Sequence, residues 1–199
     1  MKLGIDLDNT IVNYEKIFNE IGKKYCDEKS LTNKEALSNH LRSTNREKQW
    51  TKIQGEVYGP RMQEAEIALG FKEALLSCKN KIEEVVIISH RTYYPSAGGK
   101  YDLHQVAHNW IRTNITSNKE FSELKISIIF EVTLDNKINS IINEEVNIFI
   151  DDHLGVLTNE RFPKGVYRIH YSGNKLALDP IITMKCWSEL PSIIDQFGL

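Results

Sequence analysis

The sequence is poor in cysteine, in net charge and in long hydrophobic runs. Its three cysteines lie at positions 26, 78 and 186 and form neither a CxxC pair nor an even set, which favours a reduced protein over a disulfide framework. The net charge of −2 gives no electrostatic reason to expect nucleic-acid or anionic-membrane binding. The chain reaches Asp6 before a signal-peptide core could form, and no later apolar stretch approaches the ~18 residues of a membrane-spanning helix. We therefore expect a cytoplasmic protein without a membrane or nucleic-acid partner.

Internal repeats and a glycine-rich phosphate loop are also missing. The pair Gly98-Gly99 in YPSAGGKYD lacks the GxxxxGK[ST] spacing, so we interpret it as an ordinary loop. What is present is the composition of a globular protein, with 41% hydrophobic and 26% charged residues among 199. This length suffices for one domain with a sizeable core and an inserted subdomain.

The hydrophobic pattern predicts parallel strands that alternate with helices. Almost continuous β-branched runs are typical of strands that are buried on both faces of a parallel sheet. The runs that fit strands are residues 2–6, 85–89, 126–130, 146–151 and 166–170. Apolar residues at helical spacing occur in 103–111 and 190–197. This alternation favours a doubly wound α/β fold, a three-layer structure around a parallel sheet.

Residues 12–70 interrupt the alternation. They contain no convincing strand, although Tyr14, Phe18 and Ile21 belong to one helical pattern, and a polar stretch follows. An interval of about sixty residues is too long for a structureless loop in a compact domain. We therefore predict a small helical insertion after the first strand, with residues 1–11 and 71–199 forming the core.

Polar residues of particular types follow the predicted strands. In open α/β sheets, ligands bind beyond the carboxyl ends of the strands. These ends carry Asp6, Asp8, Asn9 and Thr10 after the first strand, Ser89, His90 and Arg91 after the second, and Asp151 and Asp152 after the fourth, with Lys137 opening a helical pattern before the fourth strand. Two carboxylates ~4 to 5 Å apart repel by roughly 3 to 4 kcal/mol at an effective dielectric of about 20, so a cation or a shared proton is expected beside Asp6 and Asp8.

This ordered set resembles the signature of the haloacid dehalogenase superfamily of phosphohydrolases. That signature has DxDx[TV] after strand one, Ser or Thr after strand two, Lys at a helix start and an acidic pair after the next strand. The matching residues are Asp6, Asp8 and Thr10, then Ser89, Lys137, and Asp151 with Asp152. The resemblance covers about residues 1–11 and 71–197, and it implies that residues 12–70 form a helical cap. The segments IISHR, K-x13-DD and CWSELPSII are similar to bacterial nucleotidase-like members and to the 5'(3')-deoxyribonucleotidases.

The resemblance implies a phosphomonoester hydrolase that needs Mg²⁺ and forms an aspartyl-phosphate. Asp6 would be the nucleophile, and Asp8 would protonate the leaving alkoxide and then activate water. Mg²⁺ would take carboxylate oxygens of Asp6 and Asp151, with the backbone carbonyl of Asp8 as a further ligand. Ser89 would hydrogen-bond a phosphate oxygen, and Lys137 would offset the charge of nucleophile and phosphate.

Two of these assignments have rivals. Lys125 and Lys119 are also available as the lysine of the signature, and a lysine that merely lies on the surface is the usual case. Asp152 binds the metal directly, binds it through water, or merely orients its neighbours.

Substrate contacts are predicted for Asn9, Thr10, His90 and Arg91. A solvated His90-Arg91 pair at a strand end is an equal alternative. Asn9 stands where the family often has Gly, but Asn tolerates positive φ better than most residues, so the loop can form.

Other functions fit the pattern less well. A phosphorylation-receiver domain has its acidic pair after the first strand and its acceptor Asp after the third, whereas here the acidic pair follows the fourth strand and residues 126–130 end in Phe130-Glu131. A non-catalytic phosphate-binding relative is disfavoured because every catalytic residue type is present. A glycosyltransferase normally carries its DxD deep in the chain rather than at residue 6.

The substrate depends on the insertion. A cap entering directly after Asp8 favours a small enclosed phosphomonoester, with nucleoside monophosphates ahead of sugar phosphates. Trp50, Tyr58 and Arg61 either contact a base and a phosphate or simply pack the cap.

Overall fold

The computed structural model describes residues 1–25, 33–173 and 179–198. The chain divides into two units. The first contains Met1–Val12, Ile67–Arg91 and Asn114–Leu199, and the second contains Asn13–Glu66 and Thr92–Thr113. The short strands β2 (Val12–Asn13) and β3 (Glu66–Ile67) pair with each other.

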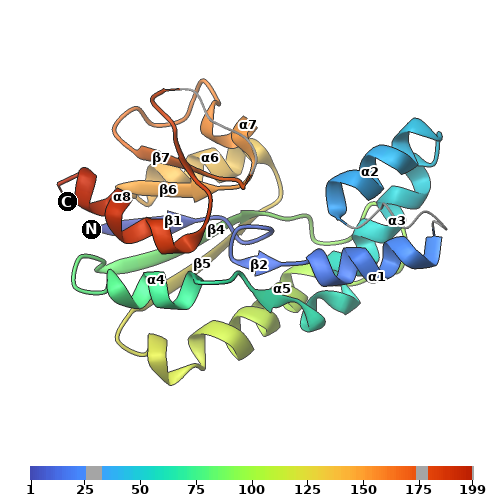
Figure 1. Cartoon of the computed structure of the whole chain (residues 1–199), viewed down its shortest axis with the longest axis horizontal. Coiled ribbons are helices and arrows are strands. Elements are labelled where there is room, and N and C mark those ends of the chain that lie inside the picture. Colours follow the sequence, from blue (N-terminus) through green and yellow to red (C-terminus); the bar gives the residue numbers. More distant parts are fainter. Residues whose placement is uncertain (26–32, 174–178, 199) are drawn as a thin grey trace. The chain divides into compact units, whose positions relative to one another are not determined.

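The first unit is built on a parallel sheet of six strands in the order β5-β4-β1-β6-β7-β8 (Figure 1). The strands are β1 (Lys2–Ile5), β4 (Glu84–His90), β5 (Lys125–Glu131), β6 (Ile148–Asp151), β7 (Tyr167–Tyr171) and β8 (Ile182–Met184). The central strand β1 pairs with β4 and β6 in parallel, so the carboxyl ends of these three strands lie at one edge of the sheet. This topology is the predicted doubly wound α/β fold, which is confirmed.

Helices cover both faces of this sheet (Figure 1). They are α4 (Phe71–Ser77), α6 (Leu134–Asn143), α7 (Leu154–Leu157) and α8 (Leu190–Gln196), with 3-10 turns at Lys119–Phe121 and Trp187–Glu189. A π turn at Arg112–Thr116 begins in the second unit and ends in the first. On one face, Val86 and Phe149 pack against Ile138, Ile141 and other apolar residues of α6 and α7. On the other, Phe71 of α4 meets the ring of Trp187 at 4.8 Å. The five predicted strand runs and the predicted helix at 190–197 therefore lie in this unit, whereas the predicted helix at 103–111 lies in the second unit.

Gly4 in β1 shows how closely the sheet packs. A Cβ at this position would lie 2.5 Å from Cδ2 of Phe149, so no larger side chain fits without displacing the ring. Leu3 and Ile5 point to the opposite face and are fully buried.

The second unit is helical. It contains α1 (Glu15–Tyr25), α2 (Lys34–Ser43), α3 (Glu47–Tyr58), α5 (Leu103–Ile111) and a 3-10 turn at Pro60–Glu64. Phe18 stacks on Trp50 at 5.7 Å, which packs α1 against α3. The indole Nε1 of Trp110 donates to the carbonyl of Ala65 at 2.9 Å, which ties α5 into the same unit. The helical insertion after β1 is confirmed.

Four details differ from the expectations. β2 and β3 pair within residues 12–70, where no strand was expected, because two-residue strands carry too little pattern to recognise. β8 was missed, because a three-residue strand carries too little pattern to recognise. Residues 92–113, assigned by sequence to the core, lie in the second unit with the insertion, and the boundary of a cap at residues 12–70 stays a prediction. Lys137 does not open its helix. α6 begins at Leu134 because the side chain of Thr133 accepts a hydrogen bond from the backbone N–H of Asn136 and caps the helix one turn earlier.

Candidate active site

The carboxyl ends of β1, β4 and β6 bring the predicted residues of the first unit together. Asp6 follows β1, Ser89 lies near the end of β4, and Asp151 ends β6. Because these strands are neighbours in the sheet, residues that are far apart in the sequence meet at this edge. The backbone N–H of Asp6 donates to the carbonyl of Ile150 at 2.9 Å, which extends the pairing to the last residues of the strands.

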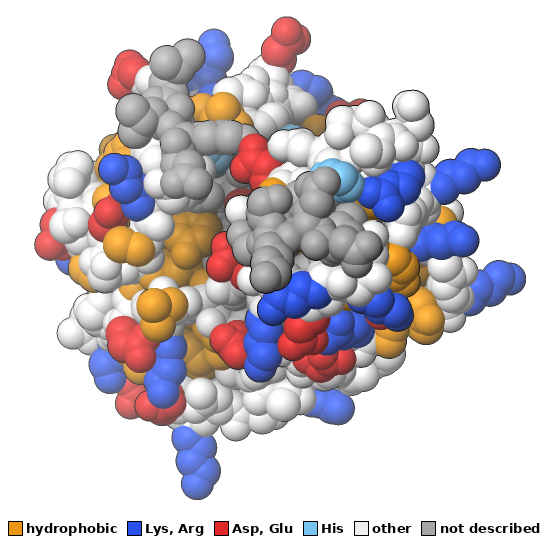
Figure 2. All heavy atoms as spheres, turned by 45° about the vertical axis from the view of Figure 1, so that its right-hand side comes forward, with side chains coloured by type: hydrophobic (Ala, Val, Ile, Leu, Met, Phe, Trp, Pro, Cys, Tyr) orange, Lys and Arg blue, Asp and Glu red, His pale blue; other side chains and the backbone are white. Residues whose placement is uncertain are grey.

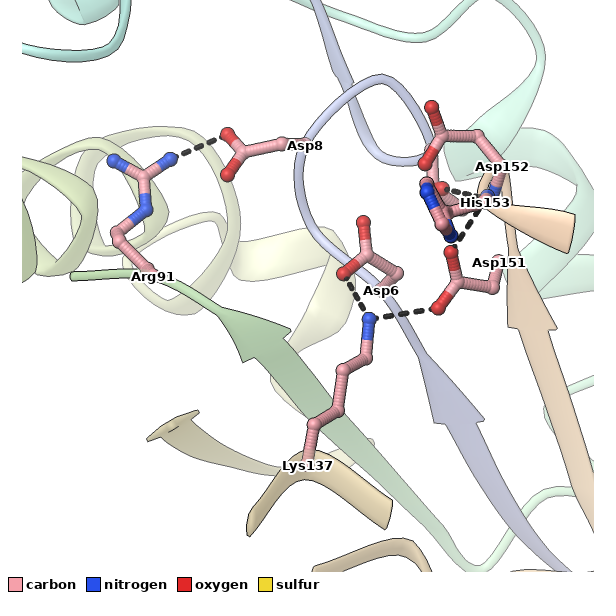
Figure 3. A network of polar contacts seen from close by, with 8 residues as sticks. Asp6, Asp8, Arg91, Lys137, Asp151, Asp152 and His153 are labelled. Atoms are coloured by element: carbon pink, nitrogen blue, oxygen red, sulfur yellow. Dashed lines mark hydrogen bonds and ion pairs between the residues drawn. The ribbon is translucent and has the colours of Figure 1, made fainter. Parts of the chain in front are cut away.

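Lys137 joins the two innermost carboxylates. Its Nζ donates to Oδ1 of Asp6 at 2.6 Å and to Oδ2 of Asp151 at 2.7 Å (Figure 3). The side chains of Lys137, Asp6 and Asp151 are 3%, 7% and 1% exposed. The lysine selected from the sequence therefore reaches the strand ends, whereas Lys125 pairs with Glu84 at the other end of the sheet.

Burial and charge shift the pKa values in this cluster. Burial raises the pKa of the Asp6 carboxyl well above its usual range, and the carboxylates of Asp151, Asp152 and Asp8 add to this, while Lys137 opposes it. Burial alone would lower the pKa of Lys137, but Asp6 and Asp151 outweigh it and hold that pKa above the usual value. One ammonium thus faces several carboxylates, and further positive charge would favour the ionised form of Asp6.

Three carboxylates can converge on a metal ion. Asp6, Asp151 and Asp152 each offer an oxygen, and these atoms all lie within 4.8 Å of one another. The backbone N–H of His153 donates to Oδ1 of Asp151 at 2.8 Å and fixes the orientation of that carboxylate. Oxygen donors from carboxylates are the ligands that Mg²⁺ prefers, so the residues present fit this ion.

Asp8 points away from this group. Its Oδ1 accepts from Nη2 of Arg91 (Figure 3). The chain turns sharply directly after Asp8, where Asn9 adopts φ 62° and its N–H donates to the carbonyl of Val12 at 3.0 Å. The expectation that Asn9 accepts a positive φ is thereby confirmed.

Thr10 is buried and stabilises the backbone at Asp152, just after β6. Its Oγ1 accepts from the backbone N–H of Asp152 at 3.2 Å, and its carbonyl accepts from Nε1 of Trp187 at 3.1 Å. Nε2 of the buried His170 donates to the carbonyl of Asp152 at 3.2 Å. Trp187 and His170 were not recognised from the sequence, because no local pattern links residues so distant along the chain.

The remaining predicted residues flank the cluster. Ser89 is buried near the end of β4, and its contact with a phosphate oxygen stays a prediction. His90 is exposed, and its Nε2 donates to the carbonyl of Val132 at 3.1 Å.

One face of the protein carries charges of both signs. On the face drawn in Figure 2, Lys and Arg side chains are interspersed with Asp and Glu. Among the described residues, every helix is too short or too polar to span a membrane.

Comparison with known proteins identifies the fold. No protein-family model and no curated protein matches the chain. Solved structures do match. One is a haloacid dehalogenase-superfamily hydrolase from Geobacter sulfurreducens, at 15% identity and a TM-score of 0.53 over 99% of this chain and 96% of that one. Another is the Bacillus subtilis hydrolase YfnB bound to magnesium, at 11% identity and a TM-score of 0.55 over 98% of both chains. The chain has a haloacid dehalogenase-like fold.

A third matching structure is described as a phosphatase. It is described as a predicted phosphoglycolate phosphatase from Haemophilus somnus and aligns at 11% identity and a TM-score of 0.53 over 96% of both chains. At such identities the likeness describes the haloacid dehalogenase-like fold, and the substrate has to be argued from the site itself.

Proposed function

We propose that this protein is a Mg²⁺-dependent phosphatase of small phosphomonoesters that acts through an aspartyl-phosphate on Asp6. The observation that carries the proposal is the buried bridge from Lys137 to Asp6 and Asp151 at the ends of β1 and β6. Burial of these three charged groups costs desolvation free energy that their mutual attraction does not reliably offset, so stability alone is a weak explanation for the bridge. The third carboxylate, Asp152, completes an oxygen set for a divalent cation.

In the first step, a carboxylate oxygen of Asp6 attacks phosphorus. The bond between phosphorus and the ester oxygen breaks, and that oxygen takes a proton from Asp8 as it leaves. In the second step, water attacks the aspartyl-phosphate while Asp8 takes one of its protons. The bond from phosphorus to Asp6 then breaks, inorganic phosphate departs, and Asp6 is regenerated.

The other residues would bind and orient the phosphoryl group. Lys137 holds Asp6 in place and offsets its charge, and Ser89 would donate to a phosphate oxygen. Asp6, Asp151, Asp152 and the backbone carbonyl of Asp8 would hold Mg²⁺, which supplies charge neutralisation for the transferring group. Asn9, Thr10 and His90 would contact substrate, and the burial of Thr10 favours contact through its backbone.

We further propose nucleoside monophosphates as the preferred substrates, with sugar phosphates as the alternative. The aromatic side chains that the sequence suggested for base stacking are engaged elsewhere: Trp50 is buried on Phe18, and Tyr58 lies edge-on to Tyr14. The second unit has another candidate, Tyr94, which is 59% exposed and follows Arg91 by three residues in the chain. Tyr93 is 57% exposed, but its ring stacks on that of His104 at 4.1 Å. Stacking of a base on such a ring contributes about 1 to 3 kcal/mol in single-strand recognition.

The test is a phosphatase screen of nucleoside monophosphates, sugar phosphates, phosphoserine and p-nitrophenyl phosphate, with Mg²⁺ and with EDTA. We expect turnover only with a divalent cation, and undiminished turnover in EDTA would refute the metal assignment. The nucleotide preference is wrong if kcat/KM for common sugar phosphates exceeds that for every nucleoside monophosphate by tenfold.

The nucleophile is tested separately. ³²P from a labelled substrate should be trapped on the wild-type protein after acid quench and be absent from Asp6→Asn. Label on Asp6→Asn would place the nucleophile at another residue.

A further inference from the structure

Arg91 is the second cation at the edge of the sheet that carries the candidate site, and it has a different partner from Lys137. It follows β4, and its side chain is 2% exposed while that of Asp8 is 20% exposed. Its backbone N–H donates to the carbonyl of Glu131 at 2.7 Å, and this hydrogen bond holds the backbone of Arg91 in place. The guanidinium thus reaches Asp8 from a firmly held backbone.

The two cations divide the carboxylates into two groups. Lys137 binds Asp6 and Asp151, which lie close to Asp152, whereas Asp8 lies outside this group and binds Arg91 (Figure 3). Asp8 follows Asp6 by two residues, and a carboxylate so close to a metal-binding group is attracted to the cation there. Arg91 offers a competing cation on the opposite side. A planar guanidinium also fixes the direction of a carboxylate better than an ammonium does.

We propose that Arg91 is a positioning residue that holds the Asp8 carboxyl on the leaving-group side of the site, apart from the metal-binding carboxylates. This inference rests on the proposed phosphatase function, and it differs from the sequence-based prediction that Arg91 contacts substrate. If Arg91 acts through Asp8, its removal matters only while Asp8 is present. If it contacts the phosphate, its removal matters in either case.

The kinetic test is a double-mutant cycle of wild type, Arg91→Met, Asp8→Asn and the double variant. The substrate is glycerol 2-phosphate, whose alkoxide leaves poorly without a proton. We expect Arg91→Met to lower kcat/KM at least tenfold in the wild-type background and less than twofold in the Asp8→Asn background. Arg91→Lys keeps the charge and should recover part of the loss. An equal loss in both backgrounds, or no loss in either, overturns the proposal.

A second readout needs no turnover. Binding of Mn²⁺, followed by electron paramagnetic resonance of the free ion, reports whether Asp8 joins the carboxylate group. Arg91→Met should tighten Mn²⁺ binding several-fold more in the wild-type background than in the Asp8→Asn background. Only the wild-type background has the Asp8 carboxylate, which is then freed from Arg91 and can approach the metal ion. Equal tightening reflects the lost positive charge alone and overturns the proposal.

Two controls separate the possible failures. Arg161→Met removes an exposed arginine that pairs with Asp135 at 3.4 Å, and it should leave Mn²⁺ binding unchanged. If wild type hydrolyses no phosphomonoester, the proposed function fails, and the Mn²⁺ cycle still decides the position of Asp8. Should Arg91→Met fail to fold, Arg91→Lys and Arg91→Gln carry both measurements.

Discussion

Replacement of Lys137 by Met tests the central cluster most directly. The variant keeps the length of the apolar stem and removes the ammonium that donates to Asp6 at 2.6 Å and to Asp151 at 2.7 Å. Both carboxylates then remain buried without their cation, while the rest of α6 is unchanged. Removing one partner of a buried ion pair costs about 3 to 5 kcal/mol, because an uncompensated charge stays behind.

This cost should be visible as a change in melting temperature. For a chain of 150 to 250 residues, 1 kcal/mol corresponds to about 2 to 4 °C, so we expect metal-free Lys137→Met to melt roughly 6 to 20 °C below wild type. Mg²⁺ binds the same carboxylates in the proposed site. At a concentration of about 100 times its Kd, it would stabilise the folded state by about 2.7 kcal/mol and restore much of the loss.

The assay is differential scanning fluorimetry in EDTA and in a Mg²⁺ series. Lys125→Met is the matched control. It removes a 72% exposed lysine that binds Glu84 at 2.9 Å, and surface pairs contribute about 1 kcal/mol or less. If Lys137→Met and Lys125→Met melt within 2 °C of each other in EDTA, the buried bridge is not what stabilises this edge of the sheet.

Further predictions concern the pKa of Asp6, the hydrogen bond from Trp187 to Thr10, and the core of the second unit. Because the pKa of Asp6 is raised in the folded state, that state binds the proton of Asp6 more tightly than the unfolded state does. In EDTA, the stability of wild type relative to Asp6→Asn should therefore fall as the pH rises from about 4, near the pKa of an unfolded Asp, through the raised pKa of the folded state. Trp187→Phe removes the donor to the buried carbonyl of Thr10 and should cost about 1 to 3 kcal/mol in thermal or urea unfolding. Trp50→Ala empties a buried site and should lower the stability of the second unit by about 3 to 5 kcal/mol, measured by hydrogen exchange of residues 13–25 and 34–66.

Each of these has a contrary result. A stability difference between wild type and Asp6→Asn that is constant from pH 4 to 8 would contradict the burial-driven shift of the Asp6 pKa. Unchanged unfolding of Trp187→Phe would mean that the hydrogen bond to Thr10 contributes nothing. Native exchange rates in Trp50→Ala would show that the contact of its ring with Phe18 does not hold the helices together.

The helical insertion was predicted correctly, but the sequence did not decide whether its aromatic and basic residues bind substrate or pack its core. Trp50, Tyr58 and Arg61 were considered for substrate binding because aromatic and basic side chains suit nucleotides. In the structure Arg61 pairs with Glu20 and Glu64, and Trp50 is buried in the second unit. A helical unit of this size needs its large apolar side chains for its own core, which the residue types alone do not reveal.

The sequence by itself determined five of the six strands of the sheet, their alternation with helices and the residues at the strand ends. These follow from local pattern, since a buried parallel strand needs a continuous apolar run and Asp6, Ser89 and Asp151 come where such runs end. The fold class could be predicted for the same reason, and the helical insertion because an interval of about sixty residues is too long for a structureless loop.

Only the tertiary structure decided which cation meets which carboxylate. Lys137 was one of three candidates by sequence, and its selection required α6 to place it beside Asp6 and Asp151. The pairing of Arg91 with Asp8 and the bond from Trp187 to Thr10 join positions that are 83 and 177 residues apart. Contacts over such separations depend on the order of strands in the sheet and on the turns between them, which no local periodicity encodes.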